Sequence, residues 1–571
     1  MRMAMVLLLG ACVLAGAAVR RGAEYDEAYS LFVVAGAPRP DWPAGVFTAG
    51  RVRRVIARTA GPGRIAAELR ATDVHPPLYF WALAAWRRWG GPGLLAARAL
   101  SILAALAALA AVGGIAIEAG VPATSAMLFT LGCYSFAYTG AIARNFALAE
   151  ALALAGVWLA LRRRDGVPPT AALRQAGAAG LLLGAASFTN YLAAFTAGAV
   201  VAALGWSAWR TGPGAARRAG FGRALACLGT LALWLPAGGW FFLAQRDSRP
   251  GQFPPFRLAP GLALLGRDAA GAVFGGLPLY ATGRARLALG AALAAGLVAL
   301  VGMIAWRWRG IGRAEARLLL ALAAAAPAAG LLGLGLVFDS TPIELRYLAF
   351  ATPFFALLLA GALAGERQRE MGQQGMGRGM GHPVVAHRAG RAVAAAVLVV
   401  QALALAGLLS RPETMQPARA AATAAARLAG RDGLVLLPRG NDGVGVVGPF
   451  LLEAPPWLRV RLVTAAMTPG ALRAATAGAP RVVLALIVVD RESRATVPYL
   501  RAAFAVPGWR VVGTGFDTLA LAAVSPSHQE NVAQGSVVQG SVAQGSAVRA
   551  TPAPRGVPGN RSHRGTSPPA G

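Results

Sequence analysis

Long apolar stretches follow one another from the N-terminus to about residue 408, separated by short polar or Arg-rich links. Each stretch is close to the ~20 residues that a helix needs to cross the ~30 Å hydrocarbon core of a bilayer. The pattern predicts an all-α polytopic transmembrane bundle of 11–13 helices. The candidate spans are residues 3–19, 76–90, 93–117, 121–140, 142–161, 177–189, 190–208, 222–243, 286–306, 316–337, 346–364 and 391–408.

The first span, residues 3–19, is expected to be an uncleaved helix. A secretory signal peptide is the alternative interpretation. Arg20 and Arg21 follow the apolar stretch directly, however, where a cleavage region would carry small residues, and many further spans come after it.

Arg-rich loops predict which ends of the spans face the cytoplasm. Three of them, at residues 210–223, 307–317 and 366–391, are placed inside by the positive-inside rule. Working outward from these loops, we expect the first long loop, residues 20–75, to lie outside, together with everything after residue 409. Within that first loop, residues 64–71 predict a short amphipathic interfacial helix.

Residues 410–525 predict a small α/β extracytoplasmic domain after the transmembrane domain of residues 1–408. Apolar runs that read as buried strands alternate there with amphipathic segments that read as helices. From residue 526 to 571 the chain becomes a Gln-Gly-Ser-Val repeat and then a Pro/Gly/Arg-rich end, which predicts a disordered tail. The expected strands are 433–439, 458–464 and 481–490, and the expected helices are 469–478 and 493–505.

Composition agrees with a membrane protein and excludes several other classes. The chain is 56% hydrophobic and only 14% charged, against about 25% charged residues in a soluble chain. The net charge of +31 comes entirely from Arg and is spread over loops and tail, with no basic groove motif, so no nucleic-acid partner is expected. Neither a P-loop nor a GxGxxG after a strand is present, so no nucleotide site is expected.

Acidic residues are scarce, yet several gather at the predicted outer ends of spans. Asp26 and Glu27 lie just after the first span, where they predict a general base with a supporting neighbour; a solvated loop is the alternative. Asp73 and His75 precede two prolines that begin the next helix. This pair is suited to orienting a sugar hydroxyl or contacting a divalent cation, and a hydrogen-bonded structural histidine is the alternative.

Two arginines occupy similar positions. Arg144 lies between two apolar runs and is suited to binding a phosphate oxygen, or alternatively to snorkelling at the interface. Arg346 and Tyr347 open a late span on the side where the positive-inside rule disfavours cations, which favours function over topology. A simple ion pair between Arg346 and Glu344 is the alternative.

Taken in order, these stretches resemble the bacterial GT-C membrane glycosyltransferases, the group related to protein O-mannosyltransferases and lipid A aminoarabinose transferases. The resemblance covers roughly residues 1–410, and six motifs occur in the order of the family. They are the acidic pair Asp26-Glu27, the D-x-HPPLY entrance from Asp73 to Tyr79, the R-x-S segment with Arg98 and Ser101, the turn YTGAIARNFAL with Arg144 and Phe146, the element SFTNYLAAF with Asn190 and Tyr191, and the late RYL...P with Arg346, Tyr347, Leu348 and Pro353.

The resemblance implies an inverting transfer of a hexosyl or pentosyl group from a polyprenyl-phosphate carrier to an acceptor hydroxyl. It implies a multi-pass protein of the bacterial inner membrane with its active site facing the periplasm, and a glycan, lipid or protein acceptor. Asp26 is then the expected base, supported by Glu27. Binding roles are implied for Asp73, His75, Arg144, Tyr191, Arg346 and Tyr347.

Two positions depart from the family pattern, and the metal question stays open. Asn190 replaces the usual His and Phe146 the usual Tyr, which removes a hydroxyl or carrier contact at each place. Some relatives use a divalent metal, but this sequence gives no clear ligand set.

Two other function classes compete with the enzyme. A transporter or flippase for a lipid-linked sugar would favour polar sites near the midplane and repeated halves, and neither is visible in the sequence. A non-catalytic membrane scaffold that presents residues 410–525 would not require the acids at 26, 27 and 73.

Overall fold

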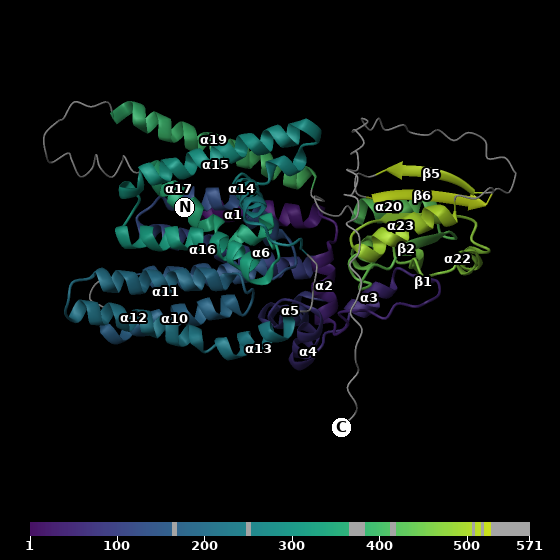
Figure 1. Ribbon diagram of the computed structural model, residues 1–571, viewed down its shortest axis with the longest axis horizontal. Coiled ribbons are helices and arrows are strands. Elements are labelled where there is room, and N and C mark those ends of the chain that lie inside the picture. The colour runs from purple at the N-terminus through teal and green to yellow at the C-terminus, as the bar shows by residue number, and fades with distance from the viewer. Residues whose placement is uncertain are drawn as a thin grey trace, which may run out of the picture.

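The protein, described here from a computed structural model, has a broad helical body with a small sheet at one end (Figure 1). The structure describes residues 1–162, 168–246, 253–364, 383–411, 418–504, 509–515 and 519–526. A helical bundle with a small α/β domain, the predicted fold class, is confirmed. Of the predicted disordered tail, residues 526–571, Pro526 ends a strand and residues 527–571 lie outside the described residues.

A helix lies at each of the twelve predicted span positions. Three of these positions are broken: the extended backbone of Cys133 ends one helix and begins the next, a second pair is bent by 48°, and in the third a 3₁₀ helix precedes the α-helix. The helices are α1 (Arg2–Arg20), α5 (Leu78–Gly90), α6 (Leu94–Ala119), α7 (Ala123–Gly132) with α8 (Tyr134–Ala141), α9 (Phe146–Leu161), α10 (Pro169–Ser187), α11 (Ala193–Arg210), α12 (Ala215–Ala232) with α13 (Leu235–Gln245), α15 (Gly283–Trp306), α16 (Ala314–Phe338), η3 (Leu345–Phe350) with α17 (Thr352–Ala364), and α19 (Pro383–Ser410).

The chain is a multi-pass helical membrane protein. Among the described residues, five helices are long and apolar enough to cross a membrane, namely α1, α6, α15, α16 and the Ala389–Ser410 part of α19; α12 and α13 together make a sixth if the bent pair is one span. The helices α7, α9 and α17 are apolar but shorter. The sequence did not predict α14 (Leu258–Val273), which packs on α15 and η3.

The first long loop is folded rather than extended. It forms α2 (Tyr25–Val34), α3 (Arg51–Ile56) and α4 (Pro62–Thr72), with a two-residue strand, β1 (Phe47–Thr48). The interfacial helix predicted at 64–71 is α4. At the start of α2, the side chains of Glu24 and Glu27 form a reciprocal capping box, which satisfies backbone N–H groups that the helix leaves free.

A six-stranded sheet in the order β1-β3-β2-β4-β6-β5 forms the C-terminal domain (residues 418–526). The three predicted strands are its parallel centre, and β1 and β6 pair with them antiparallel. The two predicted helices are α22 and α23. The elements are α20 (Ala418–Ala429), β2 (Leu434–Pro438), α21 (Val447–Glu453), β3 (Arg459–Val463), α22 (Pro469–Thr476), β4 (Val482–Ile487), α23 (Arg491–Ala503), β5 (Trp509–Gly515) and β6 (Leu519–Pro526).

Side chains of the central strands alternate between two cores, as the pleat of a strand dictates. Leu434 and Leu436 belong to a cluster with α22 and α23. Val435 and Leu437 belong to another cluster, which contains α20, α21 and also Phe32 of α2. The first loop and the C-terminal domain therefore share one apolar core, and Figure 1 shows α2 lying between the helical body and the sheet.

Candidate active site

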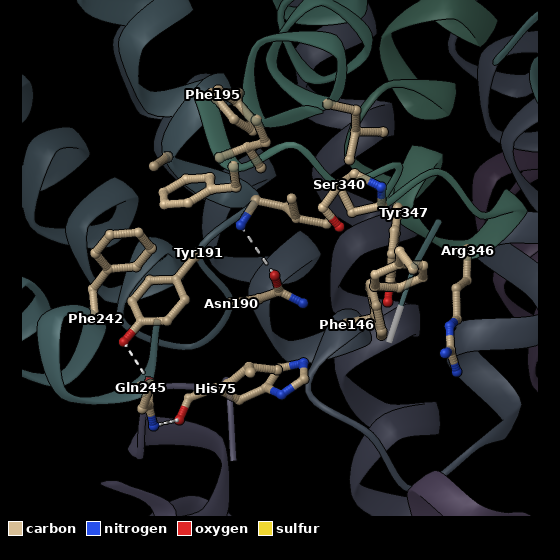
Figure 2. Close-up of a pocket in the computed structure, with 18 of the residues that line it drawn as sticks. His75, Phe146, Asn190, Tyr191, Phe195, Phe242, Gln245, Ser340, Arg346 and Tyr347 are labelled. Atoms are coloured by element: carbon tan, nitrogen blue, oxygen red, sulfur yellow. Dashed lines mark hydrogen bonds between the residues drawn. The ribbon is translucent and has the colours of Figure 1, made fainter. Parts of the chain in front are cut away.

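A cavity of about 530 Å³ opens where eight chain segments meet. The segments are mostly the links between helices: the start of α2, the α4–α5 link, the α8–α9 link, the α10–α11 link, α13, Phe253 after α13, the end of α16 and the link from α16 to η3. Six of the predicted site residues line it, among them His75, Tyr191, Arg346 and Tyr347, which Figure 2 labels. The other two predicted site residues that line the cavity are Asp26 and Arg144.

The Asp26 carboxylate lies between two guanidinium groups. Its Oδ1 is 3.6 Å from Nη2 of Arg144, and its Oδ2 accepts a hydrogen bond from Nη1 of Arg346. Arg144 also donates to the Asp26 carbonyl and to Oγ of Ser30, both at 3.3 Å. Asp26 is 8% exposed and Arg144 2%, so the charges face each other with little water around them. The predicted base and the two predicted phosphate ligands are therefore neighbours.

A second carboxylate reaches Arg346 from the other side. Oε2 of Glu344 lies 2.6 Å from Nε of Arg346, as the simple ion pair considered from the sequence requires. Arg346 still lines the cavity and bridges Glu344 to Asp26. Burial raises the pKa of Glu344; the Arg346 guanidinium opposes this shift and the Asp26 carboxylate adds to it.

His75 faces the cavity, and Asp73 lies behind it. Nδ1 of His75 is 3.2 Å from Oδ1 of Asp73 and 3.4 Å from Nη2 of Arg144. Asp73 is fully buried and does not line the cavity. Asp73 reaches the cavity through the imidazole of His75, and its binding of substrate stays a prediction.

Gln245 of α13 is a further site residue that the sequence analysis missed. Its amide donates to the carbonyl of His75 at 2.9 Å and to that of Leu69 at 3.0 Å, and its Oε1 accepts from the Tyr191 hydroxyl at 2.9 Å. Figure 2 shows this chain of hydrogen bonds along one side of the cavity. The only available signal was a polar residue at the end of an apolar run.

Glu27 does not line the cavity, so its expected support of Asp26 would be indirect. It is fully buried and accepts hydrogen bonds from Nε and Nη2 of Arg98 at 2.7 and 2.6 Å, from Ala143 N and from Glu24 N. Arg98 also donates to the carbonyls of Arg21 and Gly22. The pair fixes α2 against the bundle, and Glu27 supports Asp26 by holding its helix.

Glu24, the third acid beside this pair, is not solvated. It is 4% exposed, pairs with Arg21 and accepts a hydrogen bond from the Tyr138 hydroxyl. The three acids Glu24, Asp26 and Glu27 are therefore all buried, and each is paired with a different arginine or pair of arginines.

Both positions that depart from the family pattern line the cavity. The Phe146 ring stacks on Tyr347 with 6.1 Å between centroids, and the Asn190 side chain accepts from Leu192 N at 3.1 Å. Neither replacement has removed its residue from the wall. At position 146 the lining side chain is therefore an aromatic ring without a hydroxyl group.

The cavity has a polar end and an apolar end. Asp26, Arg144 and Arg346 gather at one end, and Figure 2 shows Phe195 and Phe242 on the side away from Arg346. Further apolar lining comes from α16, through Leu331, Leu334 and Phe338. The shape suits an amphiphile with an anionic head and a hydrocarbon chain, because arginines bind phosphate oxygens and apolar walls bind chains.

Among the described residues, no group of three or more His, Cys, Asp or Glu side chains has the geometry of a metal site. Asp26 and His75 are the lining residues of those types, and Arg144 lies against both. The described residues that line the cavity therefore do not supply three such ligands.

Comparisons with known proteins give structural neighbours but no sequence match. No protein-family model and no curated protein sequence matches the chain. ArnT from Cupriavidus metallidurans, solved with bound undecaprenyl phosphate, aligns with a TM-score of 0.47 and 15% identity, covering 91% of this chain and 97% of its own. The oligosaccharyltransferase AglB from Archaeoglobus fulgidus aligns with a TM-score of 0.43 and 12% identity, over 85% of this chain and 69% of its own.

The S. cerevisiae protein O-mannosyltransferase Pmt1-Pmt2 complex, solved with its sugar donor, covers less of the chain. It aligns with a TM-score of 0.31 and 15% identity, over 43% of this chain and 34% of its own. These three neighbours are GT-C glycosyltransferases, the group that the sequence motifs resemble.

Proposed function

We propose that the protein is a GT-C membrane glycosyltransferase that moves a sugar from a polyprenyl-phosphate carrier to an acceptor hydroxyl, with inversion at the anomeric carbon. One observation carries the proposal: a buried carboxylate lies between two arginines at the polar end of a cavity whose other end is apolar. The motif order along the chain supports it. The site would face the periplasmic side of a bacterial inner membrane.

The carrier fits the cavity through its two unlike parts. Its phosphate would bind Arg144 and Arg346, since guanidinium groups bind phosphate oxygens bidentately. Its prenyl chain would lie along Phe242 and the α16 wall. The sugar would then sit near His75 and Tyr347, within reach of polar groups on both sides of the cavity.

Asp26 is the proposed general base. It would take the proton of the acceptor hydroxyl while the oxygen attacks the anomeric carbon; the new glycosidic bond forms and the bond to the carrier phosphate breaks. The polyprenyl phosphate leaves with the extra negative charge, which the arginines stabilise. Attack opposite the leaving group inverts the anomeric centre.

The same arginines explain how Asp26 becomes a base. Both oxygens of the carboxylate lie against guanidinium groups, which attract its negative charge. An incoming phosphate competes for Arg144 and Arg346 and draws part of their charge away from Asp26. Donor binding would therefore strengthen the base before the acceptor is deprotonated.

The test is transfer by the Asp26→Asn variant in membranes supplied with a radiolabelled undecaprenyl-phosphate sugar. General-base catalysis contributes about 10²- to 10⁴-fold, so the rate should fall by that factor. Asp268→Asn is the matched control, because Asp268 is also buried and paired with an arginine but lies outside the cavity lining.

Two results would overturn the proposal. Undiminished transfer by Asp26→Asn would remove Asp26 as the base. Movement of the labelled carrier across the membrane without any glycosidic bond would favour a transporter instead.

A further inference from the structure

The C-terminal domain forms hydrogen bonds with the end of α1 and with the segment that joins α1 to α2. Arg419 of α20 donates to the backbone carbonyls of Val19 and Arg20, both at 3.1 Å, and to that of Arg21 at 2.8 Å. The same arginine pairs with Glu453 of α21 at 2.8 Å. These carbonyls end α1, where a helix leaves its last carbonyls without intrahelical partners.

Further hydrogen bonds to the C-terminal domain follow along the chain toward Asp26. Oε1 of Glu453 accepts a hydrogen bond from the backbone N–H of Ala23 at 2.7 Å. Two residues further on, the Tyr25 hydroxyl donates to Oδ2 of Asp442 at 3.0 Å. Tyr25 lines the cavity beside Asp26, so the last of these contacts connects the C-terminal domain to the cavity wall.

The loop that carries Asp442 is itself held firmly. Oδ1 of Asp442 accepts from Val444 N at 2.8 Å and Gly445 N at 3.1 Å, which folds the loop after β2 into a tight turn. The two carboxylate oxygens therefore have separate tasks: one shapes the loop and the other holds Tyr25. Gly445 lies against the Tyr25 ring so closely that a Cβ there would be 3.2 Å from the ring.

Two anchors fix this loop on either side. The Trp42 indole donates to the carbonyl of Gly443 at 2.8 Å, and the N–H of Asn441 donates to the Asp490 carboxylate at 2.8 Å. The first anchor belongs to the first loop of the chain and the second to the start of α23. Because its support is rigid, Asp442 sets the position of the Tyr25 hydroxyl rather than following it.

We propose that Asp442 is a positioning residue for the cavity: it fixes the Tyr25 ring in the wall beside Asp26, and this wall is where the acceptor approaches the base. The proposal rests on the proposed function. The donor phosphate is assigned to Arg144 and Arg346 and its chain to the apolar end. Tyr25 lies on the side toward the C-terminal domain, and we assign this side to the acceptor.

The test measures how readily Asp26 reacts with a water-soluble carbodiimide and glycine amide in the full-length protein in lipid nanodiscs. Peptide mass spectrometry gives the labelling rate at Asp26, and the exposed carboxylate of Glu315 serves as the internal reference. The variants are Tyr25→Phe, Asp442→Asn and the double variant. Tyr29→Phe is the matched control: it lies on the same helix and loses a hydroxyl that bonds Thr72, not the C-terminal domain.

We expect labelling at Asp26 to rise roughly 3- to 10-fold in each single variant, since a hydrogen bond of typical strength corresponds to a factor of that order. The double variant should equal the single ones, because both remove the same contact. Labelling of the buried Asp268 should stay unchanged, which separates a local release of Tyr25 from general loosening. A rate at Asp26 no higher than in Tyr29→Phe, or equal rises at Asp26 and Asp268, would overturn the proposal.

Transfer from the radiolabelled carrier is measured in the same preparations. If the wild type transfers sugar while the variants label like the control, the positioning role fails alone. If the wild type transfers nothing and labelling changes as expected, the proposed function fails and Asp442 still positions Tyr25.

Discussion

The Arg98–Glu27 pair offers the sharpest test of how the site is held, through the variant Glu27→Gln. Arg98 is fully buried, and its five N–H groups meet five acceptors: two oxygens of Glu27 and the carbonyls of Ala18, Arg21 and Gly22. A glutamine removes the negative charge and turns an amide N–H₂ toward a donor. Arg98 would remain buried without the carboxylate that pairs with its charge.

Removing one partner of a buried pair costs about 3–5 kcal/mol. Natural proteins have about 5–15 kcal/mol of stability in total, so the variant should be close to unfolding. The matched control is Glu118→Gln, which breaks the half-exposed Arg313–Glu118 contact at 3.6 Å. A pair of that kind is worth about 0–1 kcal/mol.

The double variant Glu27→Gln/Arg98→Met distinguishes this pair from an ordinary buried salt bridge. Replacing both charges with apolar groups is often neutral elsewhere. Here, removal of Arg98 takes this donor from the carbonyls of Ala18 and Gly22, while the Arg21 carbonyl keeps Arg419; each unsatisfied buried carbonyl costs about 1–3 kcal/mol. We therefore expect the double variant to stay well below the wild type.

The assay is reversible unfolding in mixed micelles, titrated with a denaturing detergent and followed by tryptophan fluorescence. A free-energy loss in Glu27→Gln no larger than that in Glu118→Gln would refute the reasoning about the buried charge. Full recovery in the double variant would refute the role of Arg98 as a cap of α1.

Three further predictions concern the cavity. Arg346→Lys should lower transfer from the labelled carrier more than about tenfold, because a lysine keeps the charge but not the planar fork that spans Asp26 and a phosphate; equal rates would contradict it. The pKa of Glu344 is raised above its ordinary value of 4.5, so its protonated carboxyl group contributes stability that is fully present below that pH and is lost as pH rises through the raised pKa. Glu344→Gln should therefore flatten the fall of the unfolding free energy above that pH; an unchanged slope would count against it. Gln245→Leu leaves the His75 carbonyl without its donor and should lower the unfolding free energy in the micelle titration by about 1–3 kcal/mol. An unchanged unfolding free energy would contradict this prediction and would mean that water replaces the amide.

The positions of most helices and strands followed from the sequence because each depends on a local property. The length of an apolar run predicts a span, and a short run of β-branched and aliphatic residues between turn signals predicts a buried strand. The breaks were harder to predict. Cys133 interrupts a continuous apolar run, and nothing in its neighbourhood differs from an unbroken span.

The roles of the three acids at 24, 26 and 27 could not be separated from the sequence. They share the same surroundings in the chain, and on a helix each successive residue points about 100° away from the last. That rotation turns Asp26 to the cavity and Glu27 to the bundle. Which partner each one meets depends on Arg98, Tyr138 and Arg346, which lie at least 71 residues away along the chain.

The separation of the C-terminal domain from the membrane domain along the chain is not a separation in space. The first loop contributes β1, whose Phe47 pairs with Val460 of β3, and α2 shares an apolar core with α20 and α21. Residues that follow the transmembrane domain along the chain thus complete the packing of α2, the helix that carries Asp26. A helix buried on both faces has less freedom to move than one resting on the bundle alone, and this gives the arginines a fixed carboxylate to hold. The C-terminal domain is therefore part of the structure that places Asp26. The apolar stretches of the transmembrane domain cover only one face of the helix that carries this residue.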